Sequence, residues 1–329
     1  ATLGMYYTQI NNFVLAKEAV APIVEPALKL ENKRRMAQIF TILSLDAYAV
    51  EEDFPKALKL MSEAIRFGSE TKDLISLVMA NHYLGHLYSD NFEFEKALHH
   101  LEKGLEINVA ANVVWGIADH KGCISRTVHC FQGNMYLGLQ ICHEGLQLAE
   151  KSGDIYSKGE AHVSLGYAYY GKGFLDEAEN HLIKGNDLTG RLNMIALQAL
   201  ASSCLGDTHF HRGEHPVSLD YYGNAVRLLE HCGQMNSFVA LFKLGAARAG
   251  VMTGQRTGDL EALYRYAAQN KSKLIDGVVK RRISEILLHM GSQYMKEAET
   301  WIQKAVEADE QNGLPWQLAM DWVRYAELC

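Results

Sequence analysis

Two histidines one helical turn apart are the residues of this sequence whose spacing best suits chemistry. His82 and His86 are separated by four positions, and Asp90 follows after four more. On a helix this spacing places the three side chains on one face, where they could ligate zinc or another transition metal. A metal site also needs further ligands and an outer shell that orients them, and the sequence names neither. We therefore expect the pair to contact solvent or a partner, with no resident metal or cofactor, and a metal-dependent enzyme is the least favoured function.

Two further motifs resemble sites in part. The segment 166–173, GYAYYGKG, partly matches the sequence motif of a phosphate-binding loop. Such a loop also needs Ser or Thr after the lysine and a β-strand before it. Here Gly173 follows Lys172, and a helical pattern precedes the segment. The histidine-rich run 209–215 is a weaker metal candidate, because His209 falls on a position where other repeats place tyrosine. The sequence shows no recognisable set of a nucleophile, a general base and a residue that orients the base, so no catalytic residue is predicted.

Composition restricts the class of protein. Of 329 residues, 48% are hydrophobic and 5 are proline, which excludes disordered and collagen-like chains. The 32 basic against 39 acidic residues give a net charge of −7, which argues against nucleic acid as a partner. The six cysteines form no CxxC pair and indicate reduced thiols in a cytoplasmic protein; Cys123 and Cys130, seven positions apart, are expected to be buried thiols. No apolar run reaches the 18 residues of a membrane span, so no membrane contact is expected.

A repeat of about forty residues runs through the chain. A small residue recurs in segments such as FPKALKLMSEAI and FEKALHHLEKGL, and twelve positions earlier a glycine follows leucine, as in Leu84-Gly85 and Leu165-Gly166. Each pattern places a stripe on one face of a helix. Small side chains are needed where two helices cross closely, because the ridges of one helix settle into the grooves of its partner. Each repeat is therefore predicted to be a helical hairpin.

Eight hairpins are expected over residues 1–329 as one solenoid domain, with an unpaired helix at the end. Their second helices centre on small residues at similar spacing: Ala16, Ala57, Ala97, Gly138, Ala178, Ser218, Ala262 and Ala298. Pro22 and Pro26 should kink or shorten the second helix, and 251–261 should form a longer turn. The terminal segment 314–329 is apolar almost all round, whereas the last repeat of a solenoid normally has a polar outer face. We therefore expect a longer parent protein, or a partner contact through Trp316 and Trp322.

The spacing Leu-Gly-Tyr on the first helix and Ala-apolar-small on the second resembles the tetratricopeptide repeat, lengthened from thirty-four residues. A second, narrower resemblance is to repeats that follow an ATPase module in bacterial adenylate/guanylate cyclase-type signalling proteins. It is carried by the segments 51–65, 92–117, 151–185 and 297–328. The first resemblance implies an all-α, right-handed superhelical solenoid of antiparallel helix pairs. The second implies a regulatory region whose catalytic domains lie outside this chain.

In the repeat family the first helix of each pair lines the concave surface, and its outward positions are counted from the glycine of the Leu-Gly pair. The residues predicted there for a partner-binding groove are His82, His86, Thr127, Tyr167, Tyr170, Asp207, Phe210 and Phe242. Family members that clamp a peptide carboxylate place Lys, Arg and Asn at these positions, so that function is disfavoured. Aromatic anchors with few polar groups suit a peptide or an amphipathic helix. The sequence thus predicts a non-catalytic protein-interaction scaffold; the alternatives are a small-molecule sensor and, for the aromatic residues, simple packing between hairpins.

Overall fold

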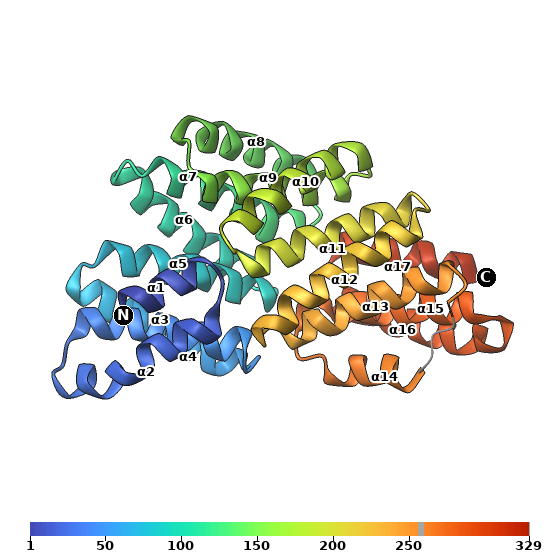
Figure 1. Ribbon diagram of the computed structural model, residues 1–329, viewed down its shortest axis with the longest axis horizontal. Helices are drawn as coiled ribbons and strands as arrows, with labels where there is room; N and C mark the ends of the chain where they lie inside the picture. The colour runs from blue at the N-terminus through green and yellow to red at the C-terminus, as the bar shows by residue number, and fades with distance from the viewer. Residues whose placement is uncertain (256–259, 329) are drawn as a thin grey trace.

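The structure, a computed structural model, describes residues 1–255 and 260–328, and these form α-helices with no strand (Figure 1). The first eight helices are α1 (Thr2–Gln9), α2 (Phe13–Lys29), α3 (Lys33–Ala49), α4 (Phe54–Thr71), α5 (Leu74–Asp90), α6 (Phe94–Ala110), α7 (Val114–Cys123), which continues as the π-helical segment η1 (Ile124–Cys130), and α8 (Met135–Ser152). The others are α9 (Ile155–Gly171), α10 (Leu175–Arg191), α11 (Ile195–His211), α12 (His215–Cys232), α13 (Asn236–Met252), α14 (Leu260–Gln269), α15 (Asp276–Met290), α16 (Met295–Gln311) and α17 (Pro315–Leu328). Each odd-numbered helix up to α15 packs against the helix that follows it. The predicted all-α solenoid of antiparallel helix pairs is confirmed.

Small residues hold the two helices of a pair close together. Ala57, Ala97 and Ala178 have no exposed surface. A Cβ atom on Gly85 would lie 2.4 Å from Leu101 Cγ, and one on Gly166 would lie 2.5 Å from Leu182 Cγ. These distances are far below van der Waals contact, so a side chain at Gly85 or Gly166 would displace the leucine that faces it across the pair.

The turns within the central pairs also depend on glycine. Gly133, Gly173 and Gly213 occupy equivalent turns and have φ angles of +80°, +77° and +78°. This left-handed region is one that glycine enters without steric cost. The turn glycines and the crossing glycines therefore set the same forty-residue register.

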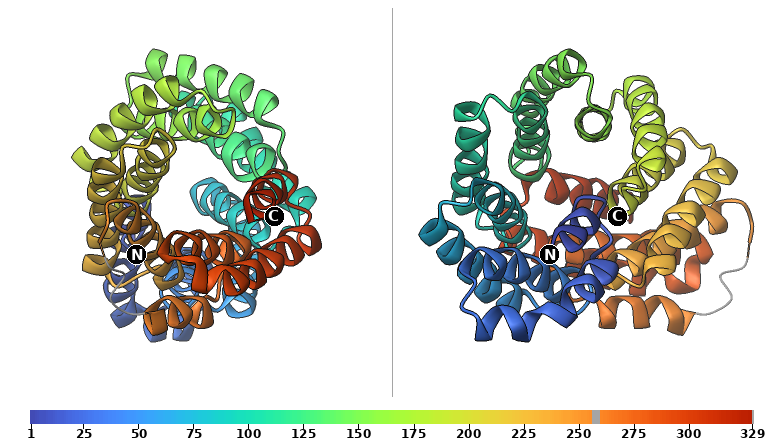
Figure 2. Two further views of the ribbon diagram at one scale, coloured as in Figure 1. Left: turned by 90° about the vertical axis from the view of Figure 1, so that its right-hand side faces the viewer. Right: turned by 60° about the vertical axis from the view of Figure 1, so that its left-hand side comes forward.

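Successive pairs wind round a common axis (Figure 2), and after about one turn the chain meets its own beginning. The connection between α12 and α13 rests on the first two pairs: Met235 N donates to Ala49 O at 2.6 Å, and Gln234 Nε2 donates to Asn11 O at 2.7 Å. Glu52 Oε1 accepts from Ser237 N at 2.8 Å. We call this contact the seam. Because of the seam, the inner side of the superhelix is partly enclosed.

The second helix departs from its prediction. Pro22 and Pro26 lie within α2, and this helix keeps 17 residues, so the prolines do not shorten it, and the expected kink stays a prediction. Both prolines and Glu18 are on the exposed side of the helix. Water can therefore satisfy the carbonyl groups that the prolines leave without a donor. Part of the expected turn 251–261, residues 256–259, lies outside the described residues.

The last helix folds back onto the body of the solenoid. Trp316 Nε1 donates to Gly171 O at the end of α9, at 3.1 Å, whereas the Trp322 side chain is 51% exposed. The two tryptophans predicted for a partner contact thus have different roles here: Trp316 is an internal contact, and Trp322 remains on the surface.

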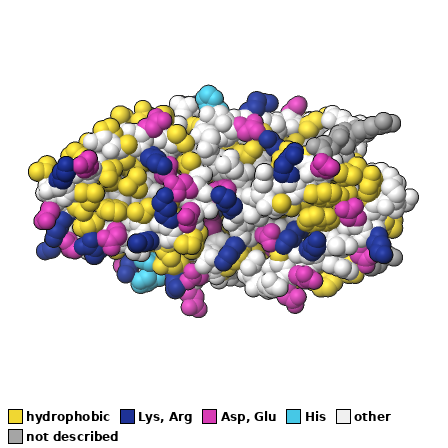
Figure 3. Space-filling view, turned by 90° about the horizontal axis from the view of Figure 1, so that it is seen from below, with side chains coloured by type: hydrophobic (Ala, Val, Ile, Leu, Met, Phe, Trp, Pro, Cys, Tyr) yellow, Lys and Arg dark blue, Asp and Glu magenta, His cyan; other side chains and the backbone are white. Residues whose placement is uncertain are grey.

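Charged side chains of both signs are interspersed over the face seen from below, with hydrophobic patches between them (Figure 3). Over the described residues, no helix combines the length and the apolar character that crossing a bilayer requires.

Two buried carboxyl groups face each other across α16 and α17 and predict a pH dependence. Burial, followed by the negative charge of Asp321, raises the pKa of Asp309 to about 8, against 3.8 for a free side chain. The folded chain therefore retains a proton that the unfolded chain releases above pH 3.8, so this group's contribution to the free energy of unfolding falls as the pH rises from about 4 to about 8 and is constant above that. We expect Asp309→Asn to remove this fall. Urea unfolding at a series of pH values measures it, and parallel profiles for the two proteins would refute the assignment.

Candidate functional site

The first helices of the pairs enclose two adjoining cavities inside the superhelix. The first has a volume of about 170 Å³, and its lining comes mainly from α3, α5, α7, η1, α9, α11 and α13. The second has a volume of about 130 Å³ and extends towards α15 and α17. Six residues line both: Phe131, Tyr167, Leu200, Phe238, Phe242 and Leu274. We call the two cavities together the inner chamber.

A third cavity, of about 540 Å³, lies at the seam. Its lining includes Glu52 from the α3–α4 connection and Lys271 and Lys273 from the segment before α15. It shares Tyr48 and Phe238 with the first cavity. The seam cavity is therefore next to the inner chamber, at the place where the second pair meets the seventh.

Seven of the eight residues predicted for a groove line the inner chamber. They are His82, His86, Thr127, Tyr167 and Phe242 in the first cavity, with Tyr170 and Asp207 in the second. Phe210 is separate from them. It is 7% exposed, and the guanidinium carbon of Arg248 lies 3.7 Å from the centre of its ring. We therefore leave Phe210 out of the site.

Aromatic side chains form much of the chamber wall. The rings of Phe131 and Tyr167 meet edge to face with centroids 6.0 Å apart, and those of Tyr170 and Trp316 are 6.1 Å apart. Sequence reasoning missed Phe131 and Phe238. Phe238 precedes Phe242 by one helical turn on α13, and that spacing is the signal that would have found it.

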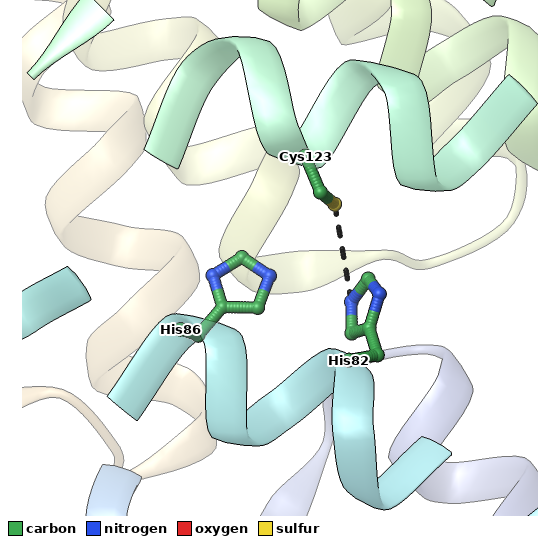
Figure 4. A group of neighbouring side chains, drawn as sticks. All are labelled: His82, His86 and Cys123. Atoms are coloured by element: carbon green, nitrogen blue, oxygen red, sulfur yellow. Dashed lines mark hydrogen bonds between the residues drawn. The ribbon is translucent and has the colours of Figure 1, made fainter. Parts of the chain in front are cut away.

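A cluster of titratable groups lies in one part of the wall, between α5 and the next pair. We call His82, His86, Asp119, His120 and Cys123 the histidine cluster. His82 Nε2 is 3.9 Å from Cys123 Sγ, and His82 Nδ1 is 3.6 Å from Asp119 Oδ2. Figure 4 shows both imidazoles of α5 directed towards Cys123. Asp90, which the sequence places on the same helix face, instead accepts a hydrogen bond from Tyr48.

Burial keeps the histidines and the thiol of the histidine cluster uncharged at pH 7. It lowers the pKa of His86 to about 3 and that of His120 to about 4, so both imidazoles are neutral at pH 7. Burial also raises the pKa of Asp119 and of Cys123 well above their usual values. His82 Nδ1, Asp119 Oδ1 and His120 Nε2 are buried and have no hydrogen-bond partner among the described residues. Buried polar atoms of this kind cost about 1–3 kcal/mol each when they remain unpaired, so the cluster is a candidate site.

A buried network of charged side chains lies at the other end of the chamber. Asp207 accepts hydrogen bonds from Arg248 at 2.8 Å, from Arg282 at 2.9 Å and from the Tyr222 hydroxyl at 2.5 Å. Burial raises the pKa of Asp207, but the two guanidinium groups outweigh burial and hold that pKa at about 2. Arg248 also donates to Glu285 at 2.7 Å. The sequence indicated Asp207 but not its arginine partners, which come from helices one and two pairs further along.

Comparison with known proteins supports the fold. No family model matches the chain. Tetratricopeptide repeat protein 29 of Trypanosoma brucei brucei (strain 927/4 GUTat10.1) is 26% identical over 212 residues, which cover 64% of this chain and 41% of that protein. The matched region thus spans less than half of this curated relative.

Solved structures of helical-repeat proteins superpose over most of the chain. A Rap protein complexed with competence and sporulation factor has a TM-score of 0.61 at 13% identity, covering 99% of this chain and 96% of that one. The apo form of RapI has a TM-score of 0.52 at 10% identity, covering 89% and 97%. A signal transduction ATPase with numerous domains and a tetratricopeptide repeat sensor, from Pyrococcus horikoshii, has a TM-score of 0.52 at 14% identity, covering 99% of this chain and 48% of that one. At such identities the likeness shows the fold alone, and together with the helix register it shows that this chain is a tetratricopeptide-repeat-like helical solenoid.

Proposed function

We propose that this chain is a non-catalytic binding module that takes a short protein segment into its inner chamber. The observation that carries the proposal is the convergence of seven predicted groove residues on one partly enclosed wall that carries several aromatic side chains. Buried aromatic side chains supply most of the binding energy in peptide-recognition sites, while a few polar groups fix orientation. The Rap protein of similar fold, whose structure is described as complexed with competence and sporulation factor, supports the same use of this architecture.

The enclosure favours an extended peptide over a helix. In the closed superhelix the chamber cavities have volumes of about 170 and 130 Å³, whereas an α-helix with its side chains is about 10–12 Å across. The same enclosure makes a small-molecule ligand the second candidate. A thermal-shift screen against nucleotides and sugars separates the two, because a small ligand that fills the chamber raises the melting temperature without any peptide.

We further propose that binding regulates a linked signalling enzyme in the cytoplasm. The support is the resemblance of the repeats to those of cyclase-type proteins and the likeness in fold to an ATPase that carries a tetratricopeptide repeat sensor. The reading frame around the segment tests this proposal. An ATPase or cyclase domain in the same frame supports it, and a frame that holds only these repeats contradicts it.

The peptide proposal predicts that Tyr167→Ala weakens binding about tenfold or more, equivalent to about 1.4 kcal/mol. Tyr167 lines both cavities of the chamber, so an occupant loses an aromatic contact wherever it lies. The probe is a phage-displayed library of random peptides selected on the wild-type chain, with affinities measured by calorimetry. Ala196→Trp, which fills the first cavity from α11, should have the same effect by occupying the space.

The matched control is Tyr136→Ala on α8, where the side chain is 79% exposed. This variant should bind every selected peptide as the wild type does. If no peptide distinguishes the wild type from Tyr167→Ala and Ala196→Trp, or if Tyr136→Ala weakens binding equally, the chamber is not the binding site.

A further inference from the structure

We propose that His82, His86 and Cys123 form a binding site for a divalent transition-metal ion of the Zn²⁺ class in the wall of the inner chamber. Two imidazole nitrogens and a thiolate sulfur are a ligand set that zinc accepts in proteins, and imidazole with thiolate disfavours magnesium and calcium. The proposal concerns a component of the binding wall and goes beyond the proposed binding of a peptide.

The three ligand atoms are already close to the required positions. His82 and His86 are one turn apart on α5, and Cys123 is the last residue of α7, which faces them (Figure 4). One donor atom from each lies within 4.8 Å of the other two. With Zn–N near 2.0 Å and Zn–S near 2.3 Å, two such ligands of a tetrahedral ion lie about 3.6 Å apart. The 3.9 Å between His82 Nε2 and Cys123 Sγ exceeds this by only a few tenths of an ångström.

An outer ligand shell is also present. Metal-bound histidines usually donate their second ring N–H to a carboxylate, which fixes the tautomer and the ring orientation. Asp119 Oδ2 lies 3.6 Å from His82 Nδ1, the nitrogen that does not face Cys123. Asp119 is 5% exposed, and its Oδ1 has no hydrogen-bond partner among the described residues. A metal on His82 Nε2 would leave Nδ1 as the donor and bring these two groups into a hydrogen bond.

Charges of both signs lie beside the three ligands, and Arg126 pairs with Glu160. Glu160 Oε1 lies 3.8 Å from Cys123 Sγ and is held by Arg126 at 3.0 Å and by Ser164 at 2.9 Å. When the ion binds, the Cys123 thiol and the Asp119 carboxyl group each lose their proton to solvent, so the thiolate and the carboxylate together balance the two positive charges. His82, His86 and Cys123 all line the first cavity. The remaining coordination position is therefore reached from the chamber, where a water or a donor group of the occupant can fill it.

A second pair of histidines in the chain lies close together without forming a metal site. His162 Nδ1 and His181 Nδ1 lie 2.9 Å apart between α9 and α10. They satisfy each other by a hydrogen bond, and neither belongs to a group of three metal-type donors among the described residues. His162 therefore supplies a matched control.

The test uses the whole chain, reduced, stripped of metal with a chelator and titrated with Co²⁺. We expect one equivalent to bind, with the ultraviolet thiolate-to-cobalt band and the visible bands of tetrahedral cobalt, and we expect Zn²⁺ to displace it. Cys123→Ser should lose the thiolate band. Asp119→Asn should weaken Co²⁺ binding about 10–100-fold, the usual effect of removing an outer-shell partner. His162→Gln and Cys142→Ser should titrate as the wild type does.

X-ray absorption of the Zn²⁺-loaded wild type gives a readout that does not depend on any variant folding. One sulfur at about 2.3 Å with nitrogen or oxygen at about 2.0 Å supports the site. Absence of saturable Co²⁺ binding, a zinc shell without sulfur, a thiolate band that survives in folded Cys123→Ser, or equal losses in the two control variants would each overturn the proposal.

Discussion

Replacing Asp207 by alanine is expected to lower the free energy of unfolding by about 3–5 kcal/mol. The side chains of Arg248 and Arg282 are 4% and 5% exposed, and the Asp207 carboxylate lies against both. Removing one partner of a buried ion pair leaves uncompensated charge in a medium that solvates it poorly. The Tyr222 hydroxyl, which donates to the same carboxylate, loses its acceptor at the same time.

Urea denaturation of Asp207→Ala measures this loss, and Asp176→Ala provides the control. Asp176 also pairs with an arginine, Arg212, but its side chain is 89% exposed, so its loss should cost about 0–1 kcal/mol. The wild type should also lose stability in acid. Because the pKa of Asp207 falls from 3.8 to about 2 on folding, its contribution is complete above pH 3.8 and is lost as the pH falls towards 2. Equal costs for the two variants would show that the Asp207 network is not buried in solution.

Gly166→Ala should destabilise the chain by about 1–3 kcal/mol, although alanine is the better helix former. The added Cβ would lie 2.5 Å from Leu182 Cγ and 3.1 Å from the backbone nitrogen of Leu182. The leucine can rotate, but the backbone of α10 cannot move without separating the pair. The helix crossing must therefore open.

Gly223→Ala is the matched change on a helix surface. Around Gly223 of α12, the nearest atom to a new Cβ is an Arg227 side-chain nitrogen at 3.5 Å, an ordinary contact. This variant should gain roughly 0.5–1 kcal/mol. Thermal and urea unfolding of both variants should thus give changes of opposite sign, and a gain in both would mean that the repeat glycines are not at close crossings.

The helix pairs could be predicted from the sequence because the signal for each pair is local. A crossing needs a small residue on each helix, and the turn between them needs a left-handed residue such as Gly173. These requirements recur every forty residues and fall on amino-acid types that are easily recognised. The positions facing inward follow from the same register, which is why seven of the predicted groove residues line the chamber.

The closure of the superhelix could not be predicted, because it depends on small rotations between repeats that accumulate along the chain. Gln234 contacts Asn11 across more than two hundred residues, and no pattern in either segment indicates the other. The histidine cluster could not be predicted from the sequence for a similar reason. The spacing of His82 and His86 was evident, but their proximity to Asp119 and Cys123 is set by how one pair stacks on the next.

Hydrogen exchange of the chain with and without a selected peptide tests the central claim most directly, namely that the inner chamber of the closed superhelix is the binding site. The peptide should slow amide exchange in the inner helices α5, α9 and α11 and in the seam segment around Met235. Exchange in the outer helices α4, α6 and α10 should change little. Slowing confined to the outer helices, with the inner helices unaffected, would contradict the account.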